Sequence, residues 1–206
     1  MWTGTEFEVD VYFIRHGKTK SNEEKRYLSY TDEPLSEIGR DEIIGRLKSY
    51  PEVERVFTST LSRTIETAAI IYKDIRPVQI AELDEINFGD FEGKTYEQLK
   101  NNDDYIAWLD SNCRDKIKNG ESLESFIDRQ LVGLKKALKE AEMSKSIAIV
   151  AHGGTIMSIF SRLLGEDYYS FLTVNGDFKG CHIKYNISEL GDVFISHFSP
   201  VDGDNT

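Results

Sequence analysis

Short apolar runs separated by amphipathic segments dominate the hydrophobic pattern of this chain. Four runs rich in β-branched and aromatic residues predict strands at 9–14, 53–59, 78–81 and 146–151. The last of them is continuously apolar, which is typical of a strand covered on both faces. Two further runs, at 180–187 and 192–198, predict a closing hairpin around Gly191.

Between these runs, apolar residues recur at intervals of three or four, which predicts helices. The helices are expected over 36–50, 61–72 and 121–143, and from the residues after Gly154 to Leu164, where Gly165 stops the last one. Residues 94–120 predict only short polar helices and a loop. Strands alternating with helices predict a single α/β domain over residues 1–206 with a largely parallel sheet.

Composition and charge narrow the function classes. The 206 residues include 25 Lys and Arg against 36 Asp and Glu, a net charge of −11, which argues against binding to nucleic acid or acidic membranes. No apolar run approaches the roughly 20 residues of a membrane span. The acidic first ten residues lack the features of an export signal, so a cytoplasmic location is expected. The two cysteines, Cys113 and Cys181, have the spacing of neither a disulfide scaffold nor a zinc site.

Three polar clusters follow predicted strands directly, at 15–16, 59–63 and 152–154. In open α/β sheets, ligands bind outside the carboxyl ends of the strands. Two Arg and two His at one sheet edge would form a cationic pocket in an otherwise acidic protein. Helices that begin just after Ser59 and just after Gly153 would direct free N–H groups into it. Arg binds phosphate and carboxylate oxygens in a bidentate way. These Arg and His residues therefore predict a site for a phosphoryl group or a carboxylate.

Five segments carry a more specific pattern. In chain order they are RHGKTKSN, DEPLSEIG, TSTLSRTIETA, ELDEINFGDFEG and VAHGG, at 15–22, 32–39, 58–68, 82–93 and 150–154. Together they resemble the motifs of the histidine phosphatase superfamily, in the branch named for phosphoglycerate mutase. This resemblance implies a three-layer α/β/α sandwich around a largely parallel central sheet.

The resemblance also assigns the phosphate-handling residues. It implies that His16 is the nucleophile and is phosphorylated on a ring nitrogen, while its other nitrogen donates to a backbone acceptor near Gly17. Arg15, Arg63 and His152 would bind the equatorial phosphate oxygens and stabilise the charge of the transition state.

Further roles follow from the same resemblance. Asn22 and Gly153 would add contacts to the phosphate, and Glu85 would be the general acid, with a pKa raised by burial. Other acidic side chains of the same segment are expected to be solvated loop charges, namely Glu82, Asp84 and Asp90. The chemistry implied uses no metal and no other cofactor.

Three functions remain open at this point. The favoured one is a metal-independent phosphomonoesterase that acts on a small phosphorylated metabolite as a monomer or homodimer. Phosphoglycerate mutases carry a longer segment with an Arg pair after the acidic motif, whereas residues 93–120 here offer only Arg114. A mutase is therefore the first alternative. A non-catalytic protein that binds phosphorylated ligands is the second, and the presence of both His16 and Glu85 argues against it.

The segments at 18–27 and 31–35 most resemble the α-ribazole phosphatases of cobalamin synthesis, which suggests α-ribazole 5′-phosphate as substrate. Two positions depart from that group. Ser29 replaces a usual Gly, and Tyr30 replaces a usual Arg or Trp, both expected beside the mouth of the substrate site.

Overall fold

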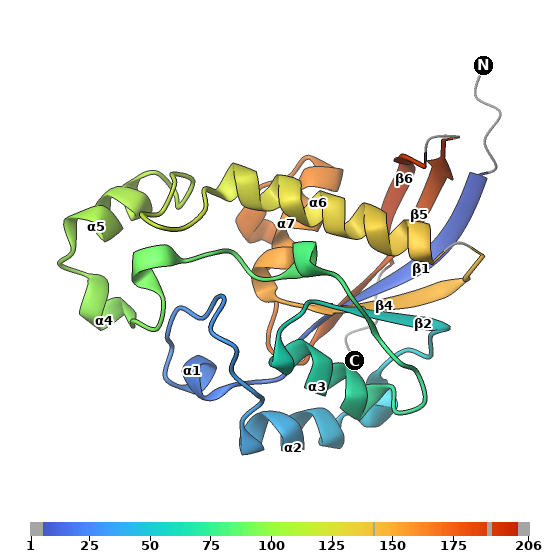
Figure 1. The fold of residues 1–206 in the computed structure, drawn as a ribbon, viewed down its shortest axis with the longest axis horizontal. Coiled ribbons are helices and arrows are strands. Elements are labelled where there is room, and N and C mark those ends of the chain that lie inside the picture. The colour runs from blue at the N-terminus through green and yellow to red at the C-terminus, as the bar shows by residue number, and fades with distance from the viewer. Residues whose placement is uncertain (1–5, 142, 189–190, 202–206) are drawn as a thin grey trace.

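A six-stranded sheet organises the molecule, in the order β3–β2–β4–β1–β5–β6 (Figure 1). The structure, a computed structural model, describes residues 6–141, 143–188 and 191–201. The strands are β1 (Glu6–Arg15), β2 (Arg55–Thr58), β3 (Val78–Gln79), β4 (Ser146–Ala151), β5 (Phe178–Ile187) and β6 (Val193–Val201). The neighbours from β3 to β1 pair in parallel, whereas β5 runs antiparallel to both β1 and β6. The prediction of a largely parallel sheet is confirmed.

Helices cover both faces of this sheet, which confirms the three-layer arrangement (Figure 1). On one face lie α2 and α3, which pack on Ile14, Ala148 and Val150, and on the other lie α6 and α7. The helices are α1 (Lys20–Glu23), α2 (Glu37–Gly45), α3 (Ser62–Ile71), α4 (Tyr96–Leu99), α5 (Asp103–Asp110), α6 (Leu123–Glu140) and α7 (Gly153–Leu164).

The central strand β4 shows why its sequence is apolar throughout. Ile147, Ile149 and Ala151 enter the core beneath α6 and α7, and the alternate residues Ala148 and Val150 enter the core beneath α2 and α3. All five are fully buried. A strand covered on both sides cannot alternate apolar with polar residues, so the continuous run is the expected signature.

Several elements are shorter than their predicted spans. The helix expected over 36–50 ends at Gly45 and is followed by a short 3-10 turn at Leu47–Ser49. The helix expected over 121–143 begins after Ser122, whose Oγ accepts a hydrogen bond from the Ser125 N–H, and ends at Glu140. Residue 142 of that prediction lies outside the described residues, as do residues 189–190 of the predicted closing turn.

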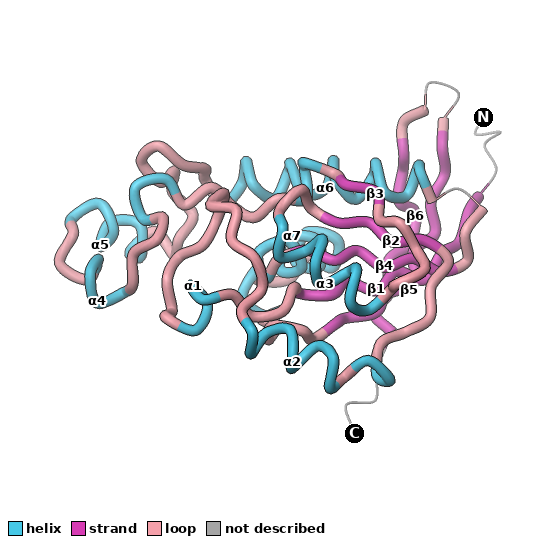
Figure 2. The backbone as a smooth tube through the Cα atoms, turned by 60° about the horizontal axis from the view of Figure 1, so that its bottom comes forward, coloured by secondary structure: helices cyan, strands magenta, loops and turns pink. Residues whose placement is uncertain are grey.

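Residues 94–120 form the α4–α5 lobe, which extends away from the sheet (Figures 1 and 2). An apolar cluster forms its centre from Tyr105 and Trp108 of the lobe and from Phe91 just before it, and Tyr27 packs against this cluster from the α1 side. The lobe therefore carries a small core separate from that of the sheet. Within the described residues, no helix combines the length and apolarity needed to cross a bilayer.

Candidate active site

Three parallel strands end side by side and bring the predicted clusters together. Arg15 at the end of β1 lies in register with Ala151 at the end of β4, and Thr58 of β2 lies in register with Val150. The residues that follow are therefore neighbours in space. The rings of His16 and His152 lie 5.1 Å apart between centroids, at an interplanar angle of 64°.

The ring of His16 is held in one tautomer. Its Nδ1 lies 2.7 Å from the carbonyl oxygen of Gly17, which can only accept, so Nδ1 carries the proton and Nε2 keeps its lone pair. The predicted contact with a backbone acceptor is thus present. Burial and the cations of Arg63 and Arg15 lower the pKa of His16 well below its usual range. The imidazole is consequently neutral, which is the form that a nucleophile requires.

Arg63 is fully buried in the first turn of α3. Its Nη2 donates to the carbonyl oxygen of Ser29 at 2.7 Å, and its Nη1 donates to that of Thr31 at 3.1 Å. Ser29 is itself buried, and it follows Leu28, which lines the cavity described below. Its carbonyl oxygen accepts from the Arg63 guanidinium and so helps to fix that side chain.

Several buried nitrogens of this region lack a hydrogen-bond partner among the described residues. They belong to three predicted phosphate-binding side chains and are Arg15 Nε, Arg63 Nε and His152 Nδ1. An unpaired buried polar group costs about 1–3 kcal/mol. The second nitrogen of His152, Nε2, is engaged with Ser59 Oγ at 2.9 Å. Unpaired nitrogens on two guanidinium groups and one imidazole form a site suited to an anion.

A cavity of about 290 Å³ opens in front of these groups. Arg15, His16, Asn22, Glu85 and Gly153 line it, whereas Arg63 and His152 lie behind its surface. The amide oxygen of Asn22 accepts from two donors of the protein, so the NH₂ group of that side chain is available to a ligand. The remaining wall includes apolar side chains, among them Leu28, Ile86, Phe88, Met157 and Leu172.

Glu85 supplies the only carboxylate among the residues described as lining this cavity. Its two oxygens accept hydrogen bonds from the N–H groups of Ile86 at 2.9 Å and Gly154 at 3.3 Å. Burial raises the pKa of Glu85 and outweighs the opposing effect of these bonds and of the nearby arginines. A Cβ at position 154 would lie 2.3 Å from Glu85 Oε1, so the carboxylate approaches this closely only because residue 154 is glycine.

The segment that carries Glu85 is held by a residue that the sequence analysis missed. Arg129 of α6 donates to the carbonyl oxygens of Glu82, Asp84 and Glu85 at 2.9–3.2 Å. Its guanidinium also forms a bidentate pair with Glu121, at 2.9 and 2.7 Å. Arg129 therefore fixes the backbone on which the acid sits. The only available signal was an Arg on a predicted helix, which is too common to single out.

The other acidic residues of this segment point elsewhere. Glu82 pairs with Lys136 at 2.5 Å, and Asp90 accepts a bond from Asn119 at 2.8 Å. Asp84 accepts from the backbone N–H and the hydroxyl of Thr60, at 2.8 and 2.9 Å. The interpretation of Asp84 as a solvated loop charge is wrong, because its carboxylate ties the acid segment to the turn before α3.

No three His, Cys, Asp or Glu side chains within the described ranges are grouped as metal ligands. Tyr30 is half exposed and, like Ser29, does not line the cavity described above. The departures from the α-ribazole phosphatase pattern at these two positions therefore do not touch the cavity directly.

Comparisons with known proteins agree with the motifs. The adenosylcobalamin/alpha-ribazole phosphatase of Escherichia coli (strain K12) is 30% identical over 189 residues, which cover 87% of this chain and 93% of that protein. Phosphoglycerate mutase-like protein 4 of Arabidopsis thaliana is 28% identical over 204 residues, covering 90% and 86%. The crystal structure of the alpha-ribazole phosphatase from Shigella flexneri has the same fold, with a TM-score of 0.73 at 24% identity over 91% of this chain and 94% of that one.

A family model covers most of the chain as well. The model described as histidine phosphatase superfamily (branch 1) matches residues 11–186, a span that includes all five motifs and every side chain that lines the cavity. On this match and the relatives above, the chain belongs to branch 1 of the histidine phosphatase superfamily.

Proposed function

We propose that this chain is a metal-independent phosphomonoesterase, folded as one catalytic domain, that works through a phosphohistidine at His16. The observation that carries the proposal is the hydrogen bond from His16 Nδ1 to Gly17, which leaves Nε2 unprotonated beside two arginines. The names of the relatives include both phosphatases and a mutase-like protein, which supports a phosphoryl-transfer activity and leaves the acceptor open.

In the first step, Nε2 attacks phosphorus and the bond from phosphorus to the ester oxygen breaks. The imidazole gains positive charge as the P–N bond forms, and the Gly17 carbonyl stabilises that charge through the Nδ1 proton. Arg15, Arg63 and His152 bind the equatorial oxygens, which is the main contribution a protein makes to phosphoryl transfer. Glu85 gives its proton to the departing alkoxide.

In the second step, the phosphoryl group passes to water. Glu85 has lost its proton and now removes one from the attacking water, the P–N bond breaks, and inorganic phosphate leaves with His16 neutral again. One carboxyl group can fill both roles because burial raises its pKa, so it holds its proton more firmly than a solvent-exposed carboxyl and still gives it to an alkoxide. The arginines supply the positive charge that a metal ion supplies in other phosphatases.

Water rather than a second hydroxyl is the acceptor we propose. Between 93 and 120, where an Arg pair would grip the carboxylate of phosphoglycerate, the chain has only Arg114, and that side chain lies 3.9 Å from Asp167. For the substrate, the motifs and the names of two relatives make α-ribazole 5′-phosphate the first compound to test.

Phosphate release from a panel of phosphorylated metabolites, with excess EDTA present, tests the proposal. The panel includes α-ribazole 5′-phosphate, 3-phosphoglycerate and a generic aryl phosphate. We expect phosphate release from the aryl ester and from at least one metabolite. Isomerisation of 3-phosphoglycerate without phosphate release would instead establish a mutase, and binding without turnover would establish a non-catalytic protein.

A further inference from the structure

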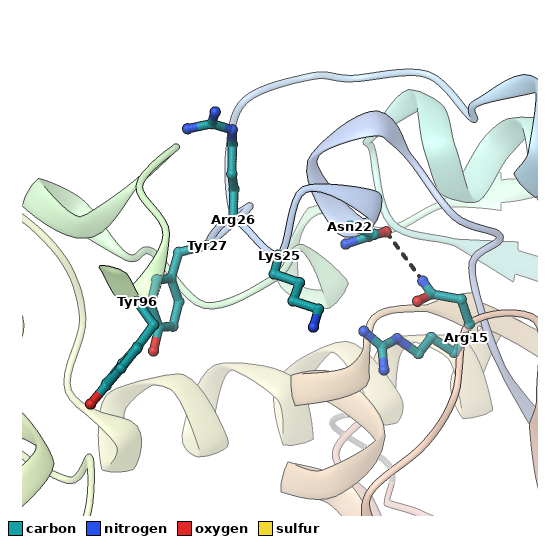
Figure 3. Close-up of a pocket in the computed structure, with 7 residues that line it drawn as sticks. Arg15, Asn22, Lys25, Arg26, Tyr27 and Tyr96 are labelled. Carbon is teal, nitrogen blue, oxygen red and sulfur yellow. Dashed lines mark hydrogen bonds between the residues drawn. The ribbon is translucent and has the colours of Figure 1, made fainter. Parts of the chain in front are cut away.

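A second cavity of about 300 Å³ adjoins the catalytic one (Figure 3). We call it the Lys25 lobe, and its lining residues are Arg15, Asn22, Lys25, Arg26, Tyr27, Tyr96 and Asn175. Four of them, Arg15, Asn22, Arg26 and Tyr27, also line the catalytic cavity, so one ligand can extend across both. Three of the lining side chains are cations, and none of those described is a carboxylate.

The three cations differ in what they already bind. Arg26 is occupied, since its Nε lies 2.6 Å from Glu24 and its Nη1 donates to the carbonyl oxygen of Gly93 at 2.7 Å. Arg15 donates to Thr173 and borders the phosphate site. Lys25 forms no ion pair with any described residue, and its side chain reaches into the lobe toward Arg15 (Figure 3).

The backbone directs Lys25 to this position. Its φ of +56° is left-handed, which is uncommon for a residue other than glycine. The chain turns here because α1 ends after one turn, with the Lys25 N–H donating to the carbonyl oxygen of Asn22. Lys25 therefore emerges beside Asn22, a residue of the catalytic cavity.

Charge balance leaves Lys25 unused by the reaction. The two negative charges of a phosphomonoester match the two guanidinium groups of Arg15 and Arg63. In a protein with a net charge of −11, one further unpaired cation lining a cavity without carboxylates is matched to a further anion. An exposed ion pair of this kind changes affinity by up to about fivefold, enough to discriminate between substrates without dominating binding.

We propose that the Lys25 lobe binds a second anionic group of the substrate, a carboxylate or a second phosphate, so that the enzyme prefers phosphomonoesters whose leaving group is itself anionic. The inference rests on the proposed function and narrows it. A nucleoside-like leaving group, as in α-ribazole 5′-phosphate, carries no such group, so it would offer no negative charge to Lys25 in the lobe.

The test compares a reference ester with two others that each differ from it in one group. The reference is glycerol 3-phosphate; 3-phosphoglycerate has a carboxylate in place of its hydroxymethyl group, and glycerol 1,3-bisphosphate carries a second phosphate on that group. The ratio of kcat/KM for each substrate with a second anionic group to kcat/KM for glycerol 3-phosphate is measured for wild type and Lys25→Asn. Asn tolerates the left-handed backbone and removes the charge. Lys73→Asn, at an exposed lysine that lines neither cavity, controls for net charge.

We expect the ratio to fall about fivefold in Lys25→Asn, to stay unchanged in Lys73→Asn and to return in Lys25→Arg. Raising the ionic strength should reduce the wild-type ratio, because salt screens exposed charges. If the ratio falls for 3-phosphoglycerate, the second group is a carboxylate, and if it falls for the bisphosphate, the second group is a phosphate. An equal ratio in wild type and Lys25→Asn overturns the inference while leaving the phosphatase intact.

Failure of the proposed function gives a different result. If no ester, including the aryl phosphate, is hydrolysed, titration calorimetry with glycerol 3-phosphate and 3-phosphoglycerate measures the same preference as a ratio of Kd values. A ratio that depends on Lys25 would then support the lobe in a binding protein. A ratio that does not depend on Lys25 would reject the inference together with the proposed function.

Discussion

The two halves of the active site are built in different ways. The phosphate half, with His16, Arg63 and His152, stands at the ends of parallel strands or in the helix that follows one, and the sheet register sets its spacing. The acid half, with Glu85, lies in a segment outside the sheet. Arg129 of α6 holds that segment, together with its ion-pair partner Glu121, which lies just before the helix.

This difference predicts which substitutions impair the function of each half. Backbone ladders of the sheet position the phosphate half redundantly, so only changes to the reacting side chains themselves should impair it strongly. A few side-chain contacts position the acid half, so a substitution outside the cavity should weaken catalysis by displacing Glu85. The substitutions below separate the two cases.

The largest effect is expected in the phosphate half, for His16→Ala. Only His16 offers the free nitrogen that forms the bond to phosphorus, so the variant should lose all measurable phosphate release. His152→Ala should retain trace activity, because His152 contributes charge stabilisation without bonding. Steady-state assays with an aryl phosphate compare the two. If His16→Ala turns over substrate as fast as His152→Ala or faster, then His16 is not the nucleophile.

In the acid half, Glu85→Gln should slow alkyl esters by about a thousandfold, since general acids contribute roughly 10²–10⁴. An aryl phosphate needs less protonation of its leaving group, so phosphorylation of His16 should suffer less. Burst kinetics with the aryl ester measures this. Equal losses for both esters and no burst would reassign the acid role.

The pH profile of Glu85→Gln sharpens the same point. Wild-type kcat/KM should decrease as the pH rises through the raised pKa of Glu85, because only the protonated acid serves the leaving group. The variant has no titrating group there, so this alkaline decrease should disappear. A profile that keeps its alkaline limb would show that another group donates the proton.

Arg129→Met tests the support of the acid half directly. The variant removes the bonds to the carbonyl oxygens of Glu82, Asp84 and Glu85, and a displaced acid should lower kcat for alkyl esters about 30-fold. KM and the aryl rate should change less, and Arg129→Lys should restore part of the loss.

Arg162→Met is the matched control for that substitution. Arg162 is also ion-paired, with Glu124 and Asp128, but it contacts no carbonyl of the acid segment among the described residues. A general loss of stability would lower the melting temperature and both rates together in Arg129→Met. That outcome would contradict a positioning role.

A smaller effect is expected for Asp84→Asn. An amide keeps one acceptor oxygen for Thr60, so the tie to the turn before α3 should weaken without breaking. We expect a destabilisation of about 1 kcal/mol and at most a threefold loss of activity. Thermal denaturation together with kcat/KM checks both, and a loss near that of Glu85→Gln would make Asp84 the better candidate acid.

The sequence predicted the two halves unequally for the same structural reason. A motif that follows a strand reveals its spatial neighbours, because parallel strands end at one edge, and the meeting of His16 and His152 followed from that rule. Arg129 contacts residues 44 to 47 positions away, and Asp84 contacts Thr60 24 positions away, through side-chain geometry that no local pattern records.

Local sequence patterns also detected some elements of the fold and missed others. The continuous apolar run of β4 and the glycine after α7 were sufficient to place both elements, whereas α1 is only four residues long and depends on the capping box at Thr19. A helix of one turn has no apolar stripe, so hydrophobic periodicity could not detect it.

Phosphorylation of His16 itself is the most direct test of the account. Glu85→Gln is mixed with an aryl phosphate, quenched without acid to preserve a phosphoramidate, and measured by intact-protein mass spectrometry with peptide mapping. One phosphoryl group per chain, located on His16 and absent from the His16→Ala, Glu85→Gln double variant, is the predicted result. A chain that releases the aryl alcohol yet carries no phosphoryl group, or carries it on another residue, would contradict the central claim.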